Sequence, residues 1–178
     1  KILSKQELRE LFEKFPSQNH RNLRDKVMLG LFIFQGVNTG TLRALKIQDV
    51  HLEKGSVYLP SLKRSNARNL PLNPAQILSL NQYLVDVRPF LEGNSEPLIL
   101  GNMSNLLTLL LAKLQTINPN VLFIRQLRTS VIVDWLREYN LREVQYFAGH
   151  RNITTTEEYL MQDVGKLKKT LGDFHPLR

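Results

Sequence analysis

A helix-spaced apolar segment near the start of the chain, residues 22–34, sets the framework for the fold. Apolar residues recur along one stripe of this segment, with further apolar residues between them: Leu23, Val27, Leu31 and Phe34. A helix that is apolar almost all round is buried inside a protein. A chain of 178 residues is long enough to bury a proper core. The sequence therefore predicts one domain over residues 1–178, built around this helix.

Capping signals and apolar periodicity predict further helices. Ser4 and Glu7 form a capping box, and helix-spaced apolar residues follow it as far as Pro16. Asn73 and Pro74 mark another helix start. Besides 22–34, the predicted helices are one after Ser4, a short one with Leu42 and Leu45, one from Pro74 to Val87, one from Ser104 or Asn105 to Leu114, and one from Arg125.

The stretch between the short helix with Leu42 and Leu45 and the helix that starts at Pro74 has β character. Residues 47–52, 56–59 and 68–72 read as strands, with a turn at 53–55 and a polar link before the last. Residues 98–100 form a brief extended piece at most. We therefore expect a mainly α fold with a small antiparallel β-sheet of two or three strands, an α+β class.

The balance of charge favours a polyanionic partner. Lys and Arg number 24 against 16 Asp and Glu, which leaves a net charge of +8 and a pI near 9.9. Nucleic acid attracts such a surface, although solubility alone would also explain it. The longest apolar run, Val27 to Phe34, is far shorter than the roughly 18 residues that a membrane span requires. The polar start of the chain does not resemble a signal peptide.

Missing residue types exclude several kinds of site. The chain has no cysteine, so it has no disulfide, thiolate metal site or cysteine nucleophile, and a cytoplasmic location is permitted. Its histidines lack metal-ligand spacing: His20, His51, His150 and His175. These residues therefore predict no metal site.

The segment 149–159 joins two predicted helices. Gly149 follows a helix-spaced apolar run, so it suits a helix end at which positive φ is needed. Thr154 and Glu157 read as a capping box that starts the next helix. Tyr159 lies in the second turn of that helix, so His150 and Tyr159 should point toward a common region. Taken alone, a half-buried tyrosine and a histidine cap would explain both residues equally.

Arg125 and Arg128 open the preceding helix. They are three residues apart, so they share one face of the first turn, where free N–H groups and the helix dipole attract anions. Two guanidinium groups there would clamp a phosphate, because each can donate two parallel hydrogen bonds. The plainer reading is a pair of solvated surface arginines.

Several motifs resemble those of the tyrosine recombinases, the family of phage integrases. Gly149, His150 and Tyr159 resemble the family's GH(x)8Y box, and residues 125–130 resemble its second box. The resemblance covers residues 3–176. It also includes a Lys-bearing turn at Lys63, the stretch Arg68-Asn69-Leu70-Pro71-Leu72 and the ending Asp173-Phe174-His175-Pro176.

The resemblance implies a site-specific recombination or integration reaction, in a phage or another mobile element. Tyr159 would attack a DNA phosphate and form a 3′-phosphotyrosyl bond, without metal or nucleotide. The implied catalytic residues are Tyr159, Arg128, His150, Lys63 and Arg125. The implied phosphate contacts are Arg64, Arg68 and Arg151, although Lys63, Arg64 and Arg68 would also suit an ordinary solvated turn.

The first family box is altered. Asn38 stands where the family has a catalytic arginine, and Thr41 where it has an acid. Arg43 lies five residues further, about 140° around a helix, so it cannot simply replace the arginine. Arg125 likewise stands at a position that is usually histidine. A catalytically impaired relative that binds DNA as an accessory protein is therefore the alternative function, and a helix-turn-helix regulator is a distant third.

The resemblance also bears on assembly. The implied partner is double-stranded DNA, and the implied assembly on it is a homo-oligomer, which in the family is a tetramer on two DNA sites. The implied location is the cytoplasm of a prokaryotic cell. No membrane or small-molecule substrate is implied. Residues 160–178 would form a C-terminal helix and tail that dock in cis or on a neighbouring protomer. The N-terminal DNA-binding domain of the family is not found in this sequence, so we expect a truncated chain.

Overall fold

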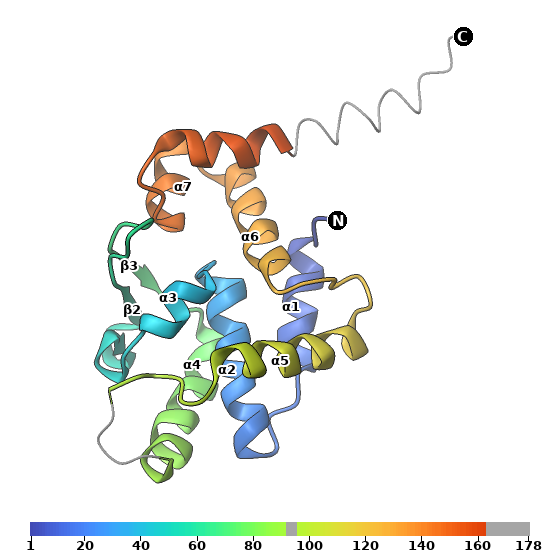
Figure 1. Ribbon diagram of the computed structural model, residues 1–178, viewed down its shortest axis with the longest axis vertical. Coiled ribbons are helices and arrows are strands. Elements are labelled where there is room, and N and C mark those ends of the chain that lie inside the picture. Colours follow the sequence, from blue (N-terminus) through green and yellow to red (C-terminus); the bar gives the residue numbers. More distant parts are fainter. Residues whose placement is uncertain (92–95, 163–178) are drawn as a thin grey trace.

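The computed structural model describes residues 1–91 and 96–162 (Figure 1). Its named helices and strands are α1 (Lys5–Lys14), α2 (His20–Phe34), α3 (Thr39–Ala44), β1 (Val50–His51), β2 (Ser56–Leu59), β3 (Arg68–Pro71), α4 (Pro74–Gln82), α5 (Met103–Ile117), α6 (Arg125–Glu138) and α7 (Leu141–Ala148). A further helix covers residues 153–162. The predicted fold class, mainly α with a small antiparallel sheet, is confirmed. Over the described ranges, no helix has the length and apolar character of a membrane span.

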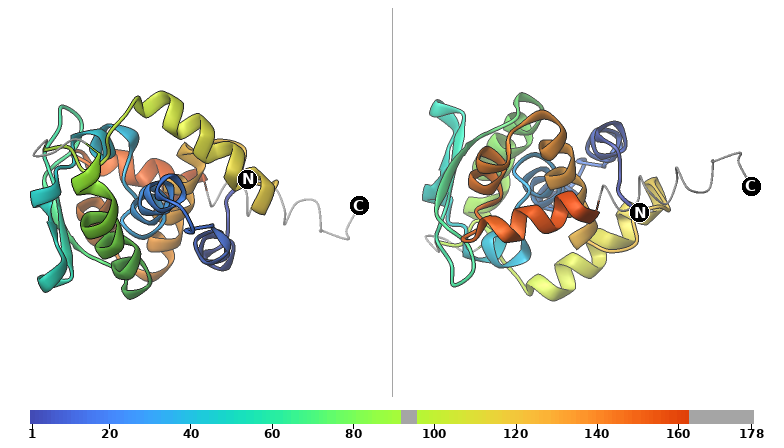
Figure 2. Two further views of the ribbon diagram at one scale, coloured as in Figure 1. Left: turned by 90° about the horizontal axis from the view of Figure 1, so that it is seen from below. Right: turned by 90° about the horizontal axis from the view of Figure 1, so that it is seen from above.

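Helix α2 lies at the centre, as its pattern predicts. It contacts α1, α4 and α6, which lie around it in Figures 1 and 2. Its buried apolar residues belong to the main core and include Val27, Met28, Leu29, Leu31 and Phe32. The helix begins at His20, two residues earlier than predicted, because the Asn19 side chain accepts a hydrogen bond from the Asn22 N–H at 2.9 Å.

The predicted capping box of α1 is confirmed, and Asn73 caps α4 as expected. The Ser4 hydroxyl accepts from the Glu7 N–H at 3.1 Å, and the Glu7 carboxylate accepts from the Ser4 N–H at 2.8 Å. The α4 helix continues to Val87, the predicted end, through a π-helical turn. Helix α5 starts one or two residues earlier than predicted, at Met103, since Asn102 supplies the cap.

The sheet has the order β1-β2-β3, and both pairs are antiparallel. The strands β2 and β3 match the prediction closely, and they pair from Ser56–Pro71 to Leu59–Arg68. The predicted strand 47–52 is wrong over most of its length, because 3-10 turns occupy Ile47–Asp49 and Leu52–Lys54. The Asp49 carboxylate accepts from the Lys46 N–H at 2.8 Å and so stabilises the first turn. Residues 98–100 form no strand either.

The C-terminal part of the described chain packs at one end of the molecule (Figure 1). Helix α7 ends at Gly149, whose φ of +70° confirms the predicted left-handed stop. The next helix begins at Ile153, so Thr154 lies inside it, and the predicted start at a Thr154–Glu157 capping box is wrong. The Asn152 carbonyl accepts from the Thr155 N–H at 3.3 Å instead. The predicted helix and tail at 160–178 lie outside the described residues beyond 162.

Candidate active site

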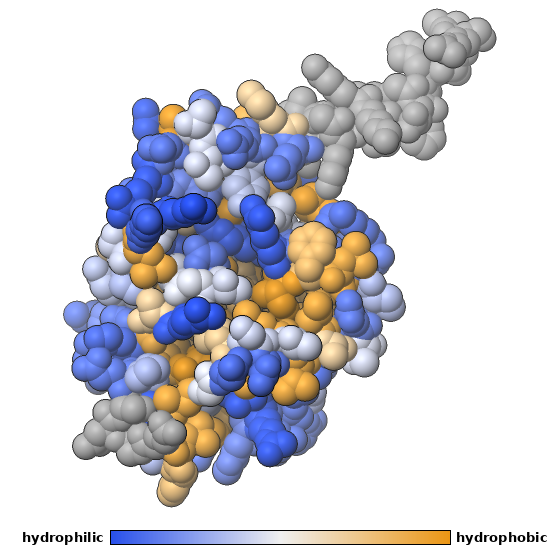
Figure 3. All heavy atoms as spheres, in the orientation of Figure 1, coloured by the Kyte–Doolittle hydropathy of each residue, from blue (hydrophilic) through white to orange (hydrophobic). Residues whose placement is uncertain are grey.

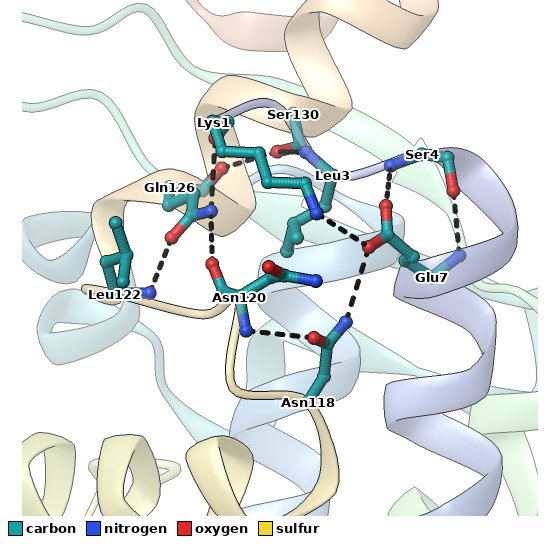
Figure 4. A network of polar contacts seen from close by, with 9 residues as sticks. All are labelled: Lys1, Leu3, Ser4, Glu7, Asn118, Asn120, Leu122, Gln126 and Ser130. Carbon is teal, nitrogen blue, oxygen red and sulfur yellow. Dashed lines mark hydrogen bonds and ion pairs between the residues drawn. The ribbon is translucent and has the colours of Figure 1, made fainter.

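The first turn of α6 is tied to the start of the chain and to the preceding loop (Figure 4). Gln126 is buried, and its Nε2 donates to the Lys1 carbonyl at 3.0 Å and the Asn120 carbonyl at 2.9 Å. One turn later, the Ser130 hydroxyl accepts from the Leu3 N–H at 2.9 Å. These bonds hold in place the helix turn that carries both arginines of the second box.

Arg128 is buried between three parts of the chain. Its Nη1 donates to the Gly36 carbonyl, just before α3. Its Nη2 donates to the Ala148 carbonyl at 2.9 Å and lies 3.1 Å from Nε2 of His150. The guanidinium therefore joins α6 to the last turn of α7 and to the loop after α2, and only 7% of the residue is exposed.

His150 is held as a neutral imidazole. An arginine can only donate, so Nε2 accepts from Arg128, and Nδ1 carries the proton and donates to the Thr156 hydroxyl at 2.9 Å. Burial, and then the charges of Arg128 and Arg68, lower the pKa of His150 to about 4. In this arrangement the ring is ready to accept a proton at Nε2 once Arg128 turns to another acceptor.

Tyr159 lies against this pair. Its ring stacks on that of His150 with a centroid distance of 5.5 Å and an interplanar angle of 13°, so the two side chains meet as predicted. Tyr159 is half-buried and lines a pocket of about 420 Å³ with Arg125 and Thr129. Burial lowers the pKa of Arg128, and the neighbouring Tyr159 opposes that change. The phenol oxygen therefore lies beside a cation that can stabilise a phenolate.

The connection between β2 and β3 lies beside the histidine segment. The Asn66 N–H donates to the Gly149 carbonyl at 2.9 Å. Nη2 of Arg151 donates to the Leu62 carbonyl, also at 2.9 Å. The exposed basic side chains of the prediction around this connection are Lys63, Arg64 and Arg151. Hydrophilic side chains dominate this end of the molecule in Figure 3.

Arg68 does not lie where the sequence suggested. It is only 2% exposed, so its guanidinium offers no surface to a DNA phosphate, in contrast to the expected phosphate contact. Its Nε donates to the Phe147 carbonyl at 2.7 Å. Burial and the neighbouring Arg128 lower the pKa of Arg68 to about 10. A Cβ on Gly149 would lie 2.3 Å from Nη1 of Arg68, so this glycine is required by packing as well as by its φ.

The altered first box is used to build local structure. The Asn38 side chain caps α3 and accepts from the Thr41 N–H at 2.7 Å. Thr41 is buried, and its hydroxyl has no hydrogen-bond partner within the described structure. Arg43 lines a hollow with residues 99–104, and Arg128 is not among the residues that line it. The expectation that Arg43 does not replace the missing arginine agrees with this placement.

Sequence reasoning missed two parts of the site. Thr156 is fully buried and fixes the proton of His150, and the run of threonines four to six residues after the histidine was its only signal. The Gly36 carbonyl, which accepts from Arg128, left no signal because any residue has a carbonyl. Among the described residues, no three His, Asp or Glu side chains gather as metal ligands.

Comparisons with known proteins converge on one family. A family model described as "Phage integrase family" matches residues 1–165. The tyrosine recombinase XerD of Oceanobacillus iheyensis is 29% identical over 98% of this chain and 62% of its own length. A tyrosine recombinase XerC of Natranaerobius thermophilus is 27% identical over 94% of this chain and 60% of its own. The chain thus spans about 60% of these relatives.

A solved structure shares the fold. The XerA recombinase superposes with a TM-score of 0.77 at 22% identity, over 100% of this chain and 64% of that one. At this level of identity the match shows the architecture alone. Because the matches to the family and to the fold both extend over nearly the whole described chain, the architecture derived above is that of these recombinases.

Proposed function

This chain belongs to the phage integrase family, and on that premise we propose that it is the catalytic domain of a site-specific tyrosine recombinase. The supporting observation is the junction of Arg128, His150 and Tyr159, which come from three separate segments and meet in one cluster, with the two buried residues against the half-buried tyrosine. The proposed reaction is the cutting and rejoining of double-stranded DNA.

In the proposed reaction, the Tyr159 oxygen attacks a backbone phosphorus and forms a P–O bond. The P–O5′ bond breaks, so the DNA gains a 5′-hydroxyl and the protein a 3′-phosphotyrosyl link. The phenol loses one proton and the leaving oxygen gains one. Storage of the phosphodiester in a covalent bond makes the step nearly isoenergetic, and the reverse attack by a second DNA end rejoins the strands.

In the proposed reaction, the arginines stabilise the negative charge that develops on the phosphate in the transition state. A DNA phosphate opposite Arg128 would compete with the Gly36 and Ala148 carbonyls for its donors. Arg125 is exposed on the same pocket as Tyr159 and supplies the second cation. Each such donor contributes on the order of 3 kcal/mol when it is aimed at developing charge.

His150 and Lys63 move the protons. A phenol has a pKa near about 10, so the site must remove its proton. The lone pair of His150 is on Nε2 and becomes free when Arg128 turns to the phosphate, and a bound phosphate anion raises the pKa of His150 back from its low value. Lys63, exposed beside this segment, protonates the leaving O5′.

The substrate and assembly follow from the same premise. The net charge of +8 suits double-stranded DNA, and we expect a homo-oligomer on two DNA sites, in the cytoplasm where that DNA lies. No cofactor and no small-molecule substrate enter the proposed reaction.

Covalent trapping tests the proposal. Full-length protein is incubated with nicked DNA that carries candidate attachment sequences, and denatured samples are examined for a DNA-linked band. We expect a band that disappears in Tyr159→Phe and persists in Tyr139→Phe, which removes the hydroxyl of an exposed tyrosine at the end of α6.

The outcomes distinguish the two candidate functions. A band that survives in Tyr159→Phe would show that another residue is the nucleophile. DNA binding without any adduct would favour the impaired accessory protein, which the use of Asn38 as a helix cap makes physically reasonable. In that case an adduct that appears only in Asn38→Arg would assign the loss of activity to the first box.

A further inference from the structure

The turn that carries Lys63 is small and exposed. Leu62 and Ser65 pair with each other across it, with N–H to carbonyl bonds of 2.9 and 3.2 Å. Lys63 and Arg64 are therefore the two central residues of a tight turn, and both are exposed. The turn holds its own shape, but these bonds do not fix its position relative to the rest of the site.

Contacts with the segment 149–151 provide that position. On one arm of the turn, the Asn66 N–H donates to the Gly149 carbonyl at 2.9 Å, and Ser65 pairs with His150 in an isolated antiparallel bridge. The other arm is held by a side chain, since Nη2 of Arg151 donates to the Leu62 carbonyl at 2.9 Å. Hydrogen bonds and bridge pairing with residues 149–151 thus hold both arms of the turn.

We propose that Arg151 is a positioning residue, which holds the Lys63 turn at a fixed place relative to His150 and Tyr159. The inference rests on the proposed function, because it concerns the residue that protonates the leaving oxygen. The lysine side chain is long and flexible, so its reach depends on where the turn is anchored. Displacement of a catalytic group by about 1 Å is enough to slow a reaction on the order of 100-fold.

This role differs from the phosphate contact that the sequence suggested. Phosphate binding alone would not require a hydrogen bond from Arg151 to the main chain of the Lys63 turn. The bond to Leu62 orients the guanidinium toward the turn. The remaining donors of Arg151 stay exposed and available to DNA.

A sulfur-substituted substrate isolates the step. In DNA whose bridging O5′ is replaced by sulfur at the cleaved phosphate, the P–S bond breaks and the sulfur leaves as a thiolate, which needs no proton donor. Loss of general-acid catalysis slows the oxygen substrate by on the order of 100-fold. We expect Lys63→Ala to show this loss and Arg151→Ala a loss of about 10-fold or more. Both variants should cleave the sulfur substrate at close to the wild-type rate.

The matched control is Arg142→Ala. Arg142 is an exposed arginine of α7 that bonds Gln145 and not the turn, so its removal causes the same change in charge. We expect this variant to cleave both substrates at the wild-type rate. If Arg151→Ala is slowed equally on oxygen and sulfur, and its salt dependence of DNA binding falls by about one ion, it is a phosphate contact and the proposal is wrong.

A second measurement needs no DNA cleavage. Hydrogen exchange of the Asn66 amide, which bonds Gly149, should be faster in Arg151→Ala and unchanged in Arg142→Ala. Unchanged exchange in both variants would overturn the proposal. Failure of the wild type to cleave either substrate would contradict the proposed function instead, and the exchange result would still decide the role of Arg151.

Discussion

The two halves of the candidate site are built in opposite ways. One half is buried and fully connected: Arg128, His150 and Thr156 form a continuous chain of hydrogen bonds. The other half is exposed, and the side chains of Lys63, Arg64 and Arg125 make no hydrogen bond or ion pair with the described residues. In one half the geometry is set before DNA arrives, and in the other the cations are left available for it.

The difference teaches how a single site can combine precision with binding to a polyanion. Preorganised donors in a dry environment lower a barrier most, because they do not have to reorient during the reaction. Exposed cations act over longer distances and are screened by salt. Changes in the buried half should therefore affect folding and chemistry together, whereas changes in the exposed half should affect DNA binding or proton transfer and leave folding intact.

The largest expected effect compares the two arginines of α6. Arg128→Ala should lower the free energy of unfolding by about 3 kcal/mol, because the Gly36 and Ala148 carbonyls and the His150 ring lose their donor. Arg125→Ala should change it by less than about 0.5 kcal/mol. Urea unfolding measures both. Equal losses would show that the buried half is no better connected than the exposed half.

The second prediction concerns two glycines with similar backbones. Gly149 and Gly55 have φ values of +70° and +59°. Alanine at Gly55 meets nothing within 4 Å and should cost about 1 kcal/mol of conformational strain. Alanine at Gly149 collides with Arg68 and should cost about 2 kcal/mol more. Chemical denaturation of both variants measures the difference, and a matching cost would mean that Arg68 moves aside freely.

The third prediction uses pH. Burial lowers the pKa of His150 from about 6.5 in the unfolded chain to about 4 in the folded protein. The unfolded state therefore binds more protons in this window, so the free energy of unfolding should fall as pH decreases from about 6.5 to 4. The slope contributed is at most about 1.4 kcal/mol per pH unit. In His150→Gln the fall should be smaller, and an unchanged pH profile would show that the imidazole is freely solvated.

The smallest expected effect concerns the proton of the histidine. Thr156→Val removes the acceptor of the His150 Nδ1–H and should cost about 1 kcal/mol of stability, whereas Thr156→Ser retains the hydroxyl and should cost less. Nitrogen NMR of the imidazole should show the Nδ1-protonated form in the wild type. The same tautomer population in the valine variant would show that Arg128 alone determines the proton position.

Local structural features were predicted well from the sequence, because they depend on residues that are neighbours in the chain. The capping boxes of α1 and α4 and the left-handed Gly149 follow from residues within one turn of one another. The errors were also local. In residues 47–52 the apolar pattern indicated a strand, but the carboxylate of Asp49 stabilises a 3-10 turn. At Thr154 the capping pattern was present, yet the helix had already begun at Ile153.

By itself, the sequence determined most of the helices, the strands β2 and β3, and the meeting of His150 with Tyr159, since periodicity, caps and a short connection act over a few residues. Only the tertiary structure decided what surrounds them. Arg128 bonds a carbonyl 92 residues away, and Arg68 bonds one 79 residues away. Whether an arginine is buried or faces DNA depends on such distant main-chain groups, which every residue type possesses and which no sequence pattern can therefore mark.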